Sequence, residues 1–239
     1  MSARRVALVT GGGVRLGAAI SEALADAGLT VVVHAHGHAA EAQALAARLE
    51  GHCVVADLAA PGAPEALVDE AVARAGRLDV LVNNAGIFEA CAAEDVDDET
   101  WARHFALNVD APFKLARAAL PHLRAHGSGS VVNLLDISAL RPYRGFAHYS
   151  ATKAALQALT VGWAAEWAPL VRVNGVSPGA ALFPPEMSER ARAHYLQRVP
   201  MGTETGAAAV ASAVCYLALG PAGITGQVLA VDGGRSAAW

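Results

Sequence analysis

The chain has 239 residues, 54% of them apolar and 17% charged, a composition that excludes a disordered chain and allows a sizeable buried core. The formal net charge is −4 at pH 7, with acidic and basic residues interspersed, which argues against a nucleic-acid partner. The length suits one α/β domain, which we expect to span residues 1–239.

Short apolar runs alternate with helix-forming segments along the chain. From the N-terminus, we expect a strand at residues 5–10, a glycine turn, a helix at 16–27, a strand at 30–34, a helix at 39–50, a strand at 52–57, a helix at 64–75 and a strand at 79–83. The pattern continues with a long helix from Asp98, kinked or ended by Pro121, and a strand at 130–135. It ends with a helix at 149–167, a strand at 171–177, a loop with a short charged helix at 184–199, a helix at 207–218 and a strand at 227–231.

Nearly continuous apolar strands that alternate with helices predict a doubly wound parallel sheet, a Rossmann fold, with helices on both faces. In such a sheet, ligands bind beyond the carboxyl ends of the strands, where the glycines and polar residues of interest are expected here.

The segment TGGGVRLG, residues 10–17, follows the first strand and opens a helix. Backbone N–H groups and the helix dipole at such a place can receive a pyrophosphate, so the segment predicts dinucleotide binding rather than a merely structural turn. Arg15 stands where another glycine could have stood, and it is either a ligand-binding residue or a solvated loop residue.

No Asp or Glu ends the second strand, where a carboxylate would select the 2′-hydroxyl of NAD. His34, His36 and His38 follow instead, and imidazoles tolerate a 2′-phosphate, so we expect NADPH or NADP rather than NAD. A metal site in this histidine run is disfavoured because no further ligand cluster accompanies it.

Tyr149 and Lys153 are four residues apart and therefore share a helix face. An ammonium beside a phenol stabilises the phenolate, so the pair can transfer a proton; the alternative is a buried Tyr with a surface Lys. Asp136 lies thirteen residues before Tyr149, and either takes part in this chemistry or caps a helix. Asn108 is unfavourable inside a helix, which suggests a role in a hydrogen-bond network; its alternative is a solvent-facing residue.

The motifs TGGGVRLG, NNAG, YSATK, RVNGVSPG and ITGQVLAVDGG, together with Asn108, resemble the short-chain dehydrogenase/reductase family from end to end. The resemblance implies an NAD(P)-binding fold, a homotetramer and a catalytic set of Asn, Ser, Tyr and Lys. Asp136 replaces the usual serine, and Arg15 replaces a glycine of the turn.

Both replacements resemble the pteridine reductases, including the dihydromonapterin reductase type. Residues 31–45 are similar to the histidine-bearing cofactor loop of that subgroup, and Phe88 falls where those enzymes stack a pterin against the nicotinamide. The catalytic set is then Asp136, Tyr149, Lys153 and Asn108, and Arg15, Phe88, Asp136 and Tyr149 are expected to bind the substrate. The expected cofactor-binding residues are Gly11, Arg15, Leu16, Gly17, His34, His36, Asp57, Leu58, Asn84, Ala85, Gly86, Tyr149, Lys153, Pro178 and Gly179.

We therefore expect an NADPH-dependent reductase of a dihydropterin or related bicyclic heterocycle, in which Tyr149 donates a proton and Lys153 lowers its pKa. One alternative is a carbonyl, 3-oxoacyl or alcohol oxidoreductase in which Ser138 replaces the usual serine. A second alternative is a non-catalytic NADP(H)-sensing protein.

The sequence also predicts a cytoplasmic protein without a membrane span. Its three cysteines have unrelated spacings, which is typical of reduced thiols, and the apolar run near the N-terminus is too short for a signal peptide. Residues 206–231 carry no charge, but glycines and Pro221 divide them into a helix, a turn and a strand.

Overall fold

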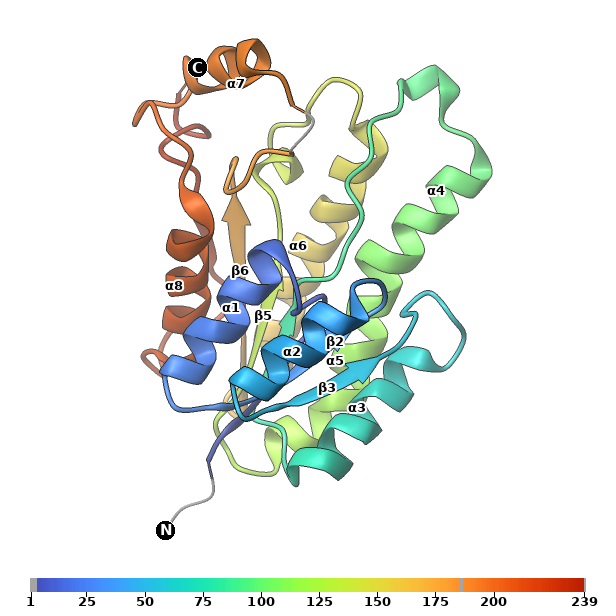
Figure 1. Ribbon diagram of the computed structural model, residues 1–239, viewed down its shortest axis with the longest axis vertical. Coiled ribbons are helices and arrows are strands. Elements are labelled where there is room, and N and C mark those ends of the chain that lie inside the picture. Colours follow the sequence, from blue (N-terminus) through green and yellow to red (C-terminus); the bar gives the residue numbers. More distant parts are fainter. Residues whose placement is uncertain (1–3, 185–186, 239) are drawn as a thin grey trace.

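The computed structural model describes residues 4–184 and 187–238, and this part of the chain forms one sheet of seven parallel strands in the order β3-β2-β1-β4-β5-β6-β7 (Figure 1). The strands are β1 (Val6–Val9), β2 (Thr30–Ala35), β3 (His52–Val55), β4 (Val80–Asn83), β5 (Gly129–Leu134), β6 (Val171–Pro178) and β7 (Val228–Val231). The strand order reverses between β1 and β4, which places a ligand crevice beyond their carboxyl ends. The predicted doubly wound sheet is confirmed.

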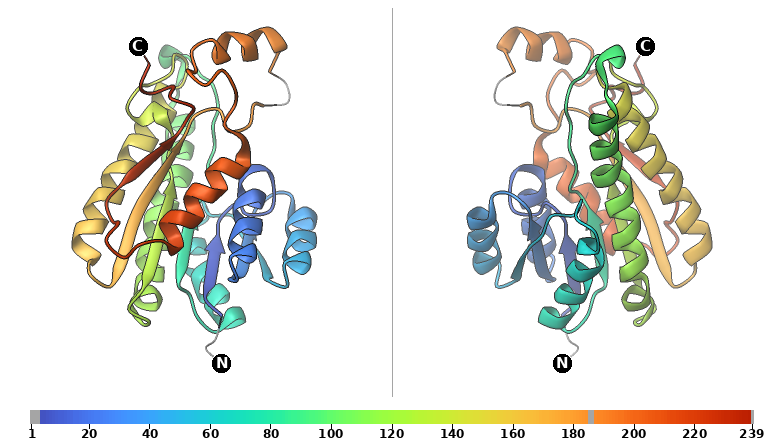
Figure 2. Two further views of the ribbon diagram at one scale, coloured as in Figure 1. Left: turned by 90° about the vertical axis from the view of Figure 1, so that its left-hand side faces the viewer. Right: turned by 90° about the vertical axis from the view of Figure 1, so that its right-hand side faces the viewer.

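Helices cover both faces of the sheet (Figure 2). They are α1 (Arg15–Asp26), α2 (Ala39–Arg48), α3 (Ala63–Ala75), α4 (Asp98–Phe105), α5 (Ala111–Arg124), α6 (Ala147–Trp167), α7 (Glu189–Leu196) and α8 (Gly206–Leu219). Residues of α1, α2 and α8 belong to the core on one face, and residues of α3, α5 and α6 to the core on the other.

The strands are apolar throughout because each of their faces meets a layer of helices. In β1, Val6 and Leu8 pack into one core while Ala7 and Val9 pack into the other, as the alternation of side chains along a strand requires. Two buried faces leave no position in β1 for a solvated side chain.

The predicted long helix from Asp98 is divided in the structure. A π-helical segment, η2 (Ala106–Asp110), separates α4 from α5, and Asn108 lies within it. Pro121 does not end the helix, because α5 continues through it to Arg124. This proline begins the last turn of α5, so it removes one hydrogen bond to the preceding turn and only three residues of the helix follow it.

Residues 184–199 were expected to form a loop with a short charged helix, and the structure places α7 there. Residues 185 and 186 lie outside the described part of the chain. Figure 1 shows α7 above the carboxyl end of β6, so it lies over the crevice rather than on a sheet face. None of the described helices is long and apolar enough to span a membrane.

Candidate active site

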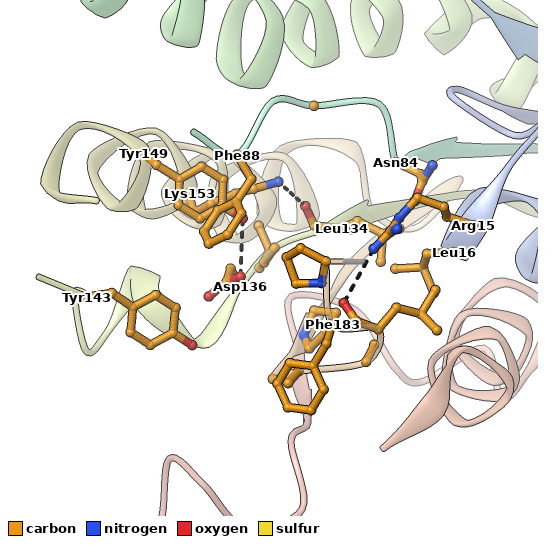
Figure 3. Close-up of a pocket in the computed structure, with 18 of the residues that line it drawn as sticks. Arg15, Leu16, Asn84, Phe88, Leu134, Asp136, Tyr143, Tyr149, Lys153 and Phe183 are labelled. Atoms are coloured by element: carbon orange, nitrogen blue, oxygen red, sulfur yellow. Dashed lines mark hydrogen bonds between the residues drawn. The ribbon is translucent and has the colours of Figure 1, made fainter. Parts of the chain in front are cut away.

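A cavity of about 320 Å³ lies at the carboxyl ends of the central strands (Figure 3), and Tyr195 of α7 is among the residues that line it. It brings together many of the predicted site residues: Arg15, Leu16, Asn84, Gly86, Phe88, Asp136, Tyr149, Lys153, Pro178 and Gly179. The other predicted residues do not line it: Gly11, Gly17, His34, His36, Asp57, Leu58, Ala85 and Asn108. Several of this second group support the walls of the cavity.

Asp136 and Tyr149 are hydrogen-bonded at the centre of the cavity (Figure 3). The Tyr149 hydroxyl donates to Asp136 Oδ2 at 3.2 Å, while Asp136 Oδ1 accepts from the backbone N–H of Ser138 at 2.7 Å. The second bond caps the short helix η3 (Ile137–Ala139). Asp136 therefore caps a helix with one oxygen and contacts Tyr149 with the other, and the cap fixes the direction of the carboxylate.

The local charges keep Tyr149 protonated. Burial, together with the carboxylate of Asp136, raises the pKa of Tyr149 well above its usual value. We expected Lys153 to lower this pKa, and the structure shows the opposite direction. The Lys153 Nζ lies 5.7 Å from the centre of the Tyr149 ring, whereas the carboxylate contacts the hydroxyl directly. Tyr149 is therefore a neutral donor.

Burial raises the pKa of Asp136 as well, because the desolvated carboxylate is disfavoured. A carboxyl group with a raised pKa holds a proton at higher pH than an exposed one. Asp136 and Tyr149 together thus form a pair that can store and pass a proton.

Lys153 lies on α6, one turn after Tyr149, and only 6% of it is exposed, so the alternative of a surface lysine is wrong. Its Nζ donates to the backbone oxygen of Leu134 at 2.8 Å. Burial lowers the pKa of Lys153 to about 8, although Asp136 opposes this shift. An ammonium has three donors, so this bond leaves two for a ligand.

Asn108 is buried and clamps the segment that follows β4. Its Oδ1 accepts from the N–H of Ile87 at 2.9 Å, and its Nδ2 donates to the oxygen of Ile87 at 3.0 Å and to Thr152 Oγ1 at 3.1 Å. These bonds exclude the solvent-facing alternative. A Cβ added at Gly86 would come within 2.9 Å of Asn108 Oδ1, so the glycine makes room for the clamp.

Phe88 follows this clamp and is 48% exposed at the cavity (Figure 3). One face of its ring stacks on Phe146, with ring centres 4.3 Å apart and planes 7° apart. Its ring also meets Tyr149 edge to face at 4.8 Å. The stack on Phe146 holds the Phe88 ring in place, so an exposed aromatic surface is available to a flat ligand.

The glycine turn after β1 is closely fitted to its neighbours. A Cβ at Gly17 would lie 1.9 Å from the oxygen of Gly11, and Gly11 has φ +59°. Asn84 Nδ2 donates to the oxygens of Thr10 and Gly11, while the Thr10 hydroxyl accepts from the N–H groups of Asn84 and Ala85. No side chain caps the start of α1, so its first N–H groups are free to bind a phosphate. The turn therefore fits a dinucleotide.

Arg15 is the first residue of α1 and has φ +51°, which is unfavourable for a residue with a Cβ. Its guanidinium donates to the backbone oxygen of Leu182 at 3.5 Å, across the cavity from the turn (Figure 3). This long bond leaves most of its donors free. Arg15 is therefore placed to meet a ligand and not simply to face solvent.

The histidines after β2 are not equivalent. His34 is buried, its Nδ1 accepts from the N–H of Gly11 at 3.1 Å and its Nε2 contacts the oxygen of Ala56 at 3.1 Å. Burial lowers the pKa of His34, which agrees with a neutral ring that accepts at one nitrogen and donates at the other. The expectation that the His34 ring faces a cofactor phosphate is thus corrected, because both nitrogens hold the turn. His36 is exposed, and His38 pairs with Glu41.

After β3, Asp57 is exposed and its Oδ1 accepts from the N–H of Ala59 at 3.0 Å, while Leu58 is buried. Neither is among the described residues that line the cavity, and their contact with a cofactor stays a prediction. Ser138 is fully buried and is not among the described residues that line the cavity. Its position does not favour the alternative in which it replaces the usual serine.

Sequence reasoning missed three aromatic residues of the cavity wall, Tyr143, Phe183 and Tyr195. Tyr143 lies between Asp136 and Tyr149, so its proximity to the pair was a usable signal. Phe183 and Tyr195 come from the segment around α7, whose path over the cavity no local pattern predicts.

Residues 13–236 match the family described as enoyl-(acyl carrier protein) reductase. Pteridine reductase 1 from Leishmania tarentolae is 35% identical over 97% of this chain and 96% of its own length. Cis-4-hydroxycyclohexanecarboxylate dehydrogenase from Sinomonas cyclohexanicum is 37% identical over 98% of each chain.

Among solved structures, FolM alternative dihydrofolate reductase 1 from Brucella suis in complex with NADP is similar with a TM-score of 0.93 and 32% identity. The similarity covers 100% of this chain and 98% of that one. With its glycine turn and its Tyr149–Lys153 pair at the ends of a doubly wound sheet, the chain belongs to the short-chain dehydrogenase/reductase family of oxidoreductases.

Proposed function

We propose that this protein is an NADPH-dependent reductase of a dihydropterin or a related bicyclic heterocycle. The observation that carries the proposal is the partly buried carboxylate of Asp136, bonded to the Tyr149 hydroxyl in the cavity. A carboxylate is a good partner for the ring nitrogens and amino group of a pterin, whereas a ketone needs only a hydroxyl donor.

The cofactor part of the proposal is supported by the glycine turn and by the unbonded N–H groups at the start of α1. The FolM structures from Brucella suis and Brucella canis are complexes with NADP. No carboxylate stands at the end of β2 to repel a 2′-phosphate; His34 stands there and His36 follows.

Reduction of a C=N bond adds a hydride to carbon and a proton to nitrogen. NADPH, when bound, supplies the hydride. The neutral Tyr149 hydroxyl supplies the proton, Asp136 assists the transfer, and the pair is recharged from solvent through the cavity. Lys153 uses its remaining donors to hold the nicotinamide ribose, as the family resemblance implies.

The substrate ring is held by groups of different chemistry. Phe88 offers a flat apolar surface, fixed from behind by Phe146, and Arg15 offers guanidinium donors to a ring carbonyl or an ordered water. The strained backbone of Arg15 supports a ligand role, because strain of this kind persists where the side chain is needed.

A second candidate is the reduction of a simple carbonyl compound. It is favoured by the 37% identity to cis-4-hydroxycyclohexanecarboxylate dehydrogenase, whose name specifies an alcohol substrate. A third, NADP(H) sensing without turnover, is disfavoured by the complete Asp136–Tyr149–Lys153 arrangement, since a pure binder has no use for a proton relay.

The deciding experiment measures NADPH oxidation with dihydropterins, dihydrofolate and activated ketones, for the parent and for Tyr149→Phe and Asp136→Ser. We expect pterin turnover that falls by roughly 100-fold or more in either variant. Ketone turnover that persists or rises in Asp136→Ser, without pterin turnover in the parent, would establish the second candidate. Tight NADPH binding without any turnover would establish the third.

We further propose that the protein is a cytoplasmic homotetramer. Large apolar side chains are exposed on α5 and α6, at Phe113 and Val161, and on α8 and β7, at Tyr216 and Leu229. Two such faces suit two kinds of subunit contact. Sedimentation at micromolar concentration tests this assembly, and a monomer would contradict it.

A further inference from the structure

Two tyrosines of the cavity wall take no part in the proton transfer proposed above. Tyr143 lies in the loop between η3 and α6, and Tyr195 lies near the end of α7. Figure 3 shows Tyr143 and Arg15 at opposite ends of the labelled residues, with Asp136 between them. A ring that reaches from Arg15 to Asp136 therefore directs its substituent towards Tyr143.

The two hydroxyl groups are neutral and close to each other. Burial, and next the carboxylate of Asp136, raises the pKa of Tyr143, and burial also raises the pKa of Tyr195. The two hydroxyls interact, and Tyr195 Oη accepts from the N–H of Ala180 at 3.1 Å. Each phenol has one proton, and their mutual contact uses only one of the two. Among the described residues, at least one O–H donor is thus left for a ligand.

Packing fixes the position of Tyr195. Its ring meets Phe183 edge to face at 5.5 Å, and the Arg235 guanidinium lies 5.9 Å from its centre. A Cβ added at Gly179 would lie 3.4 Å from the Tyr195 hydroxyl. Because its ring and hydroxyl are held from several sides, Tyr195 is preorganised for hydrogen bonding and does not need to be ordered by the ligand.

We propose that Tyr143 and Tyr195 are specificity-determining residues that bind a hydroxylated substituent on the substrate ring. This inference rests on the proposed pterin reductase function. A hydroxyl both donates and accepts, so it complements a pair of phenols that offers a free proton and free lone pairs. An apolar substituent leaves these partly buried hydroxyl groups without a partner from the ligand, which weakens its binding.

The test compares 7,8-dihydrobiopterin, which has a dihydroxypropyl substituent, with 6-methyl-7,8-dihydropterin, which has the same ring and no hydroxyl. KM, kcat and the dissociation constants of both compounds in the presence of NADP are measured for the parent, Tyr143→Phe and Tyr195→Phe. Tyr216 is not among the described residues that line the cavity, so Tyr216→Phe provides the matched control.

We expect Tyr143→Phe and Tyr195→Phe to raise KM and the dissociation constant for dihydrobiopterin by roughly 5- to 10-fold, the effect of one lost hydrogen bond. Both constants for the methyl compound and kcat for both compounds should change by less than about twofold. Substitutions that affect both compounds equally, or neither, would overturn this inference. If the parent still turns over a pterin in that case, the proposed function stands. A parent that binds neither pterin overturns both.

Discussion

Among single residues, Lys153 gives the sharpest test of the site because its burial lowers its pKa to about 8. The group binds ligands as an ammonium, so activity is expected at pH values below this pKa and is lost as the pH rises through it. We predict that kcat/KM for NADPH, which reports groups of the free enzyme, falls about tenfold per pH unit above pH 8.

The chain offers a matched pair of variants for this prediction, because Lys114 is its other lysine. Lys153→Arg keeps a positive charge at all accessible pH values, so the alkaline fall should disappear from its profile even if the absolute rate is lower. Lys114→Arg should retain the profile of the parent. An unchanged alkaline fall in Lys153→Arg would assign the ionisation to another group.

Asp136 shows how a local structural role and a chemical role can coincide in one side chain. The oxygen that caps η3 is held by the Ser138 N–H, and this bond aims the other oxygen at Tyr149. A serine at the same place has one oxygen and cannot make both contacts in this way. Aspartate in place of the usual serine therefore puts a hydrogen-bond acceptor in the cavity, where the serine hydroxyl would be a donor.

Among the elements, the π-helical segment η2 determines where the substrate surface lies. It buries Asn108, whose side chain holds both backbone groups of Ile87, and Ile87 directly precedes Phe88. π-Helical segments of one turn are frequent at functional sites. Through these two bonds, Asn108 in the π-helical segment fixes the backbone next to Phe88 and so the place of its exposed ring.

Gly86→Ala tests this clamp. The added Cβ would lie 2.9 Å from Asn108 Oδ1, so the Ile87 segment must shift and carry Phe88 with it. We predict a fall in kcat/KM for the ring substrate of roughly 10- to 100-fold, since a displacement of about 1 Å can cost that much. The dissociation constant of NADPH is measured beside it, because Gly86 is also an expected cofactor-binding residue.

The control is Gly223→Ala, since a Cβ added at Gly223 meets no atom within 4 Å. Its kinetics should match those of the parent. If Gly86→Ala has the kinetics of the parent, the Asn108 side chain accommodates the added Cβ without moving Phe88. Asn108 would then not determine the position of Phe88.

The sequence pattern predicts the regular elements well and the irregular ones poorly. Buried strands such as β1 can be recognised in the sequence because both of their faces need apolar residues. The π-helical segment does not, since it leaves helix-forming residues on both sides and shifts the register only locally. Likewise Pro121 lies inside α5, although it lacks the N–H that would bond to the preceding turn, and the helix extends only to Arg124 beyond it.

The same division applies to the site. Motif spacing placed Arg15, Asp136, Tyr149 and Lys153 together, because parallel strands end at one edge of the sheet. Motif spacing did not predict that the His34 ring bonds to the glycine turn, that the pKa of Tyr149 is raised, or that Tyr195 of α7 lines the cavity. These depend on burial and on contacts between distant segments, which no spacing records.

For the whole molecule, buried histidines set the response of stability to mild acid. Burial lowers the pKa of His34, and burial followed by the neighbouring His104 lowers the pKa of His148. A histidine with a lowered folded-state pKa binds a proton more readily when unfolded, so unfolding is favoured as the pH falls below the unfolded value of about 6.5. We predict that the free energy of unfolding decreases between pH 7 and pH 5.

The matched variants are His34→Asn and His36→Asn, measured by urea unfolding at pH 7 and pH 5. Asn can still accept from the Gly11 N–H but does not titrate, so His34→Asn should lower stability at pH 7 by about 1 kcal/mol and reduce its dependence on pH. His36 is exposed, so His36→Asn should keep the parent slope. Asp136 works in the opposite sense, because its raised pKa favours the folded state as the pH falls. A parent slope retained in His34→Asn would show that the turn releases His34 to solvent before the molecule unfolds.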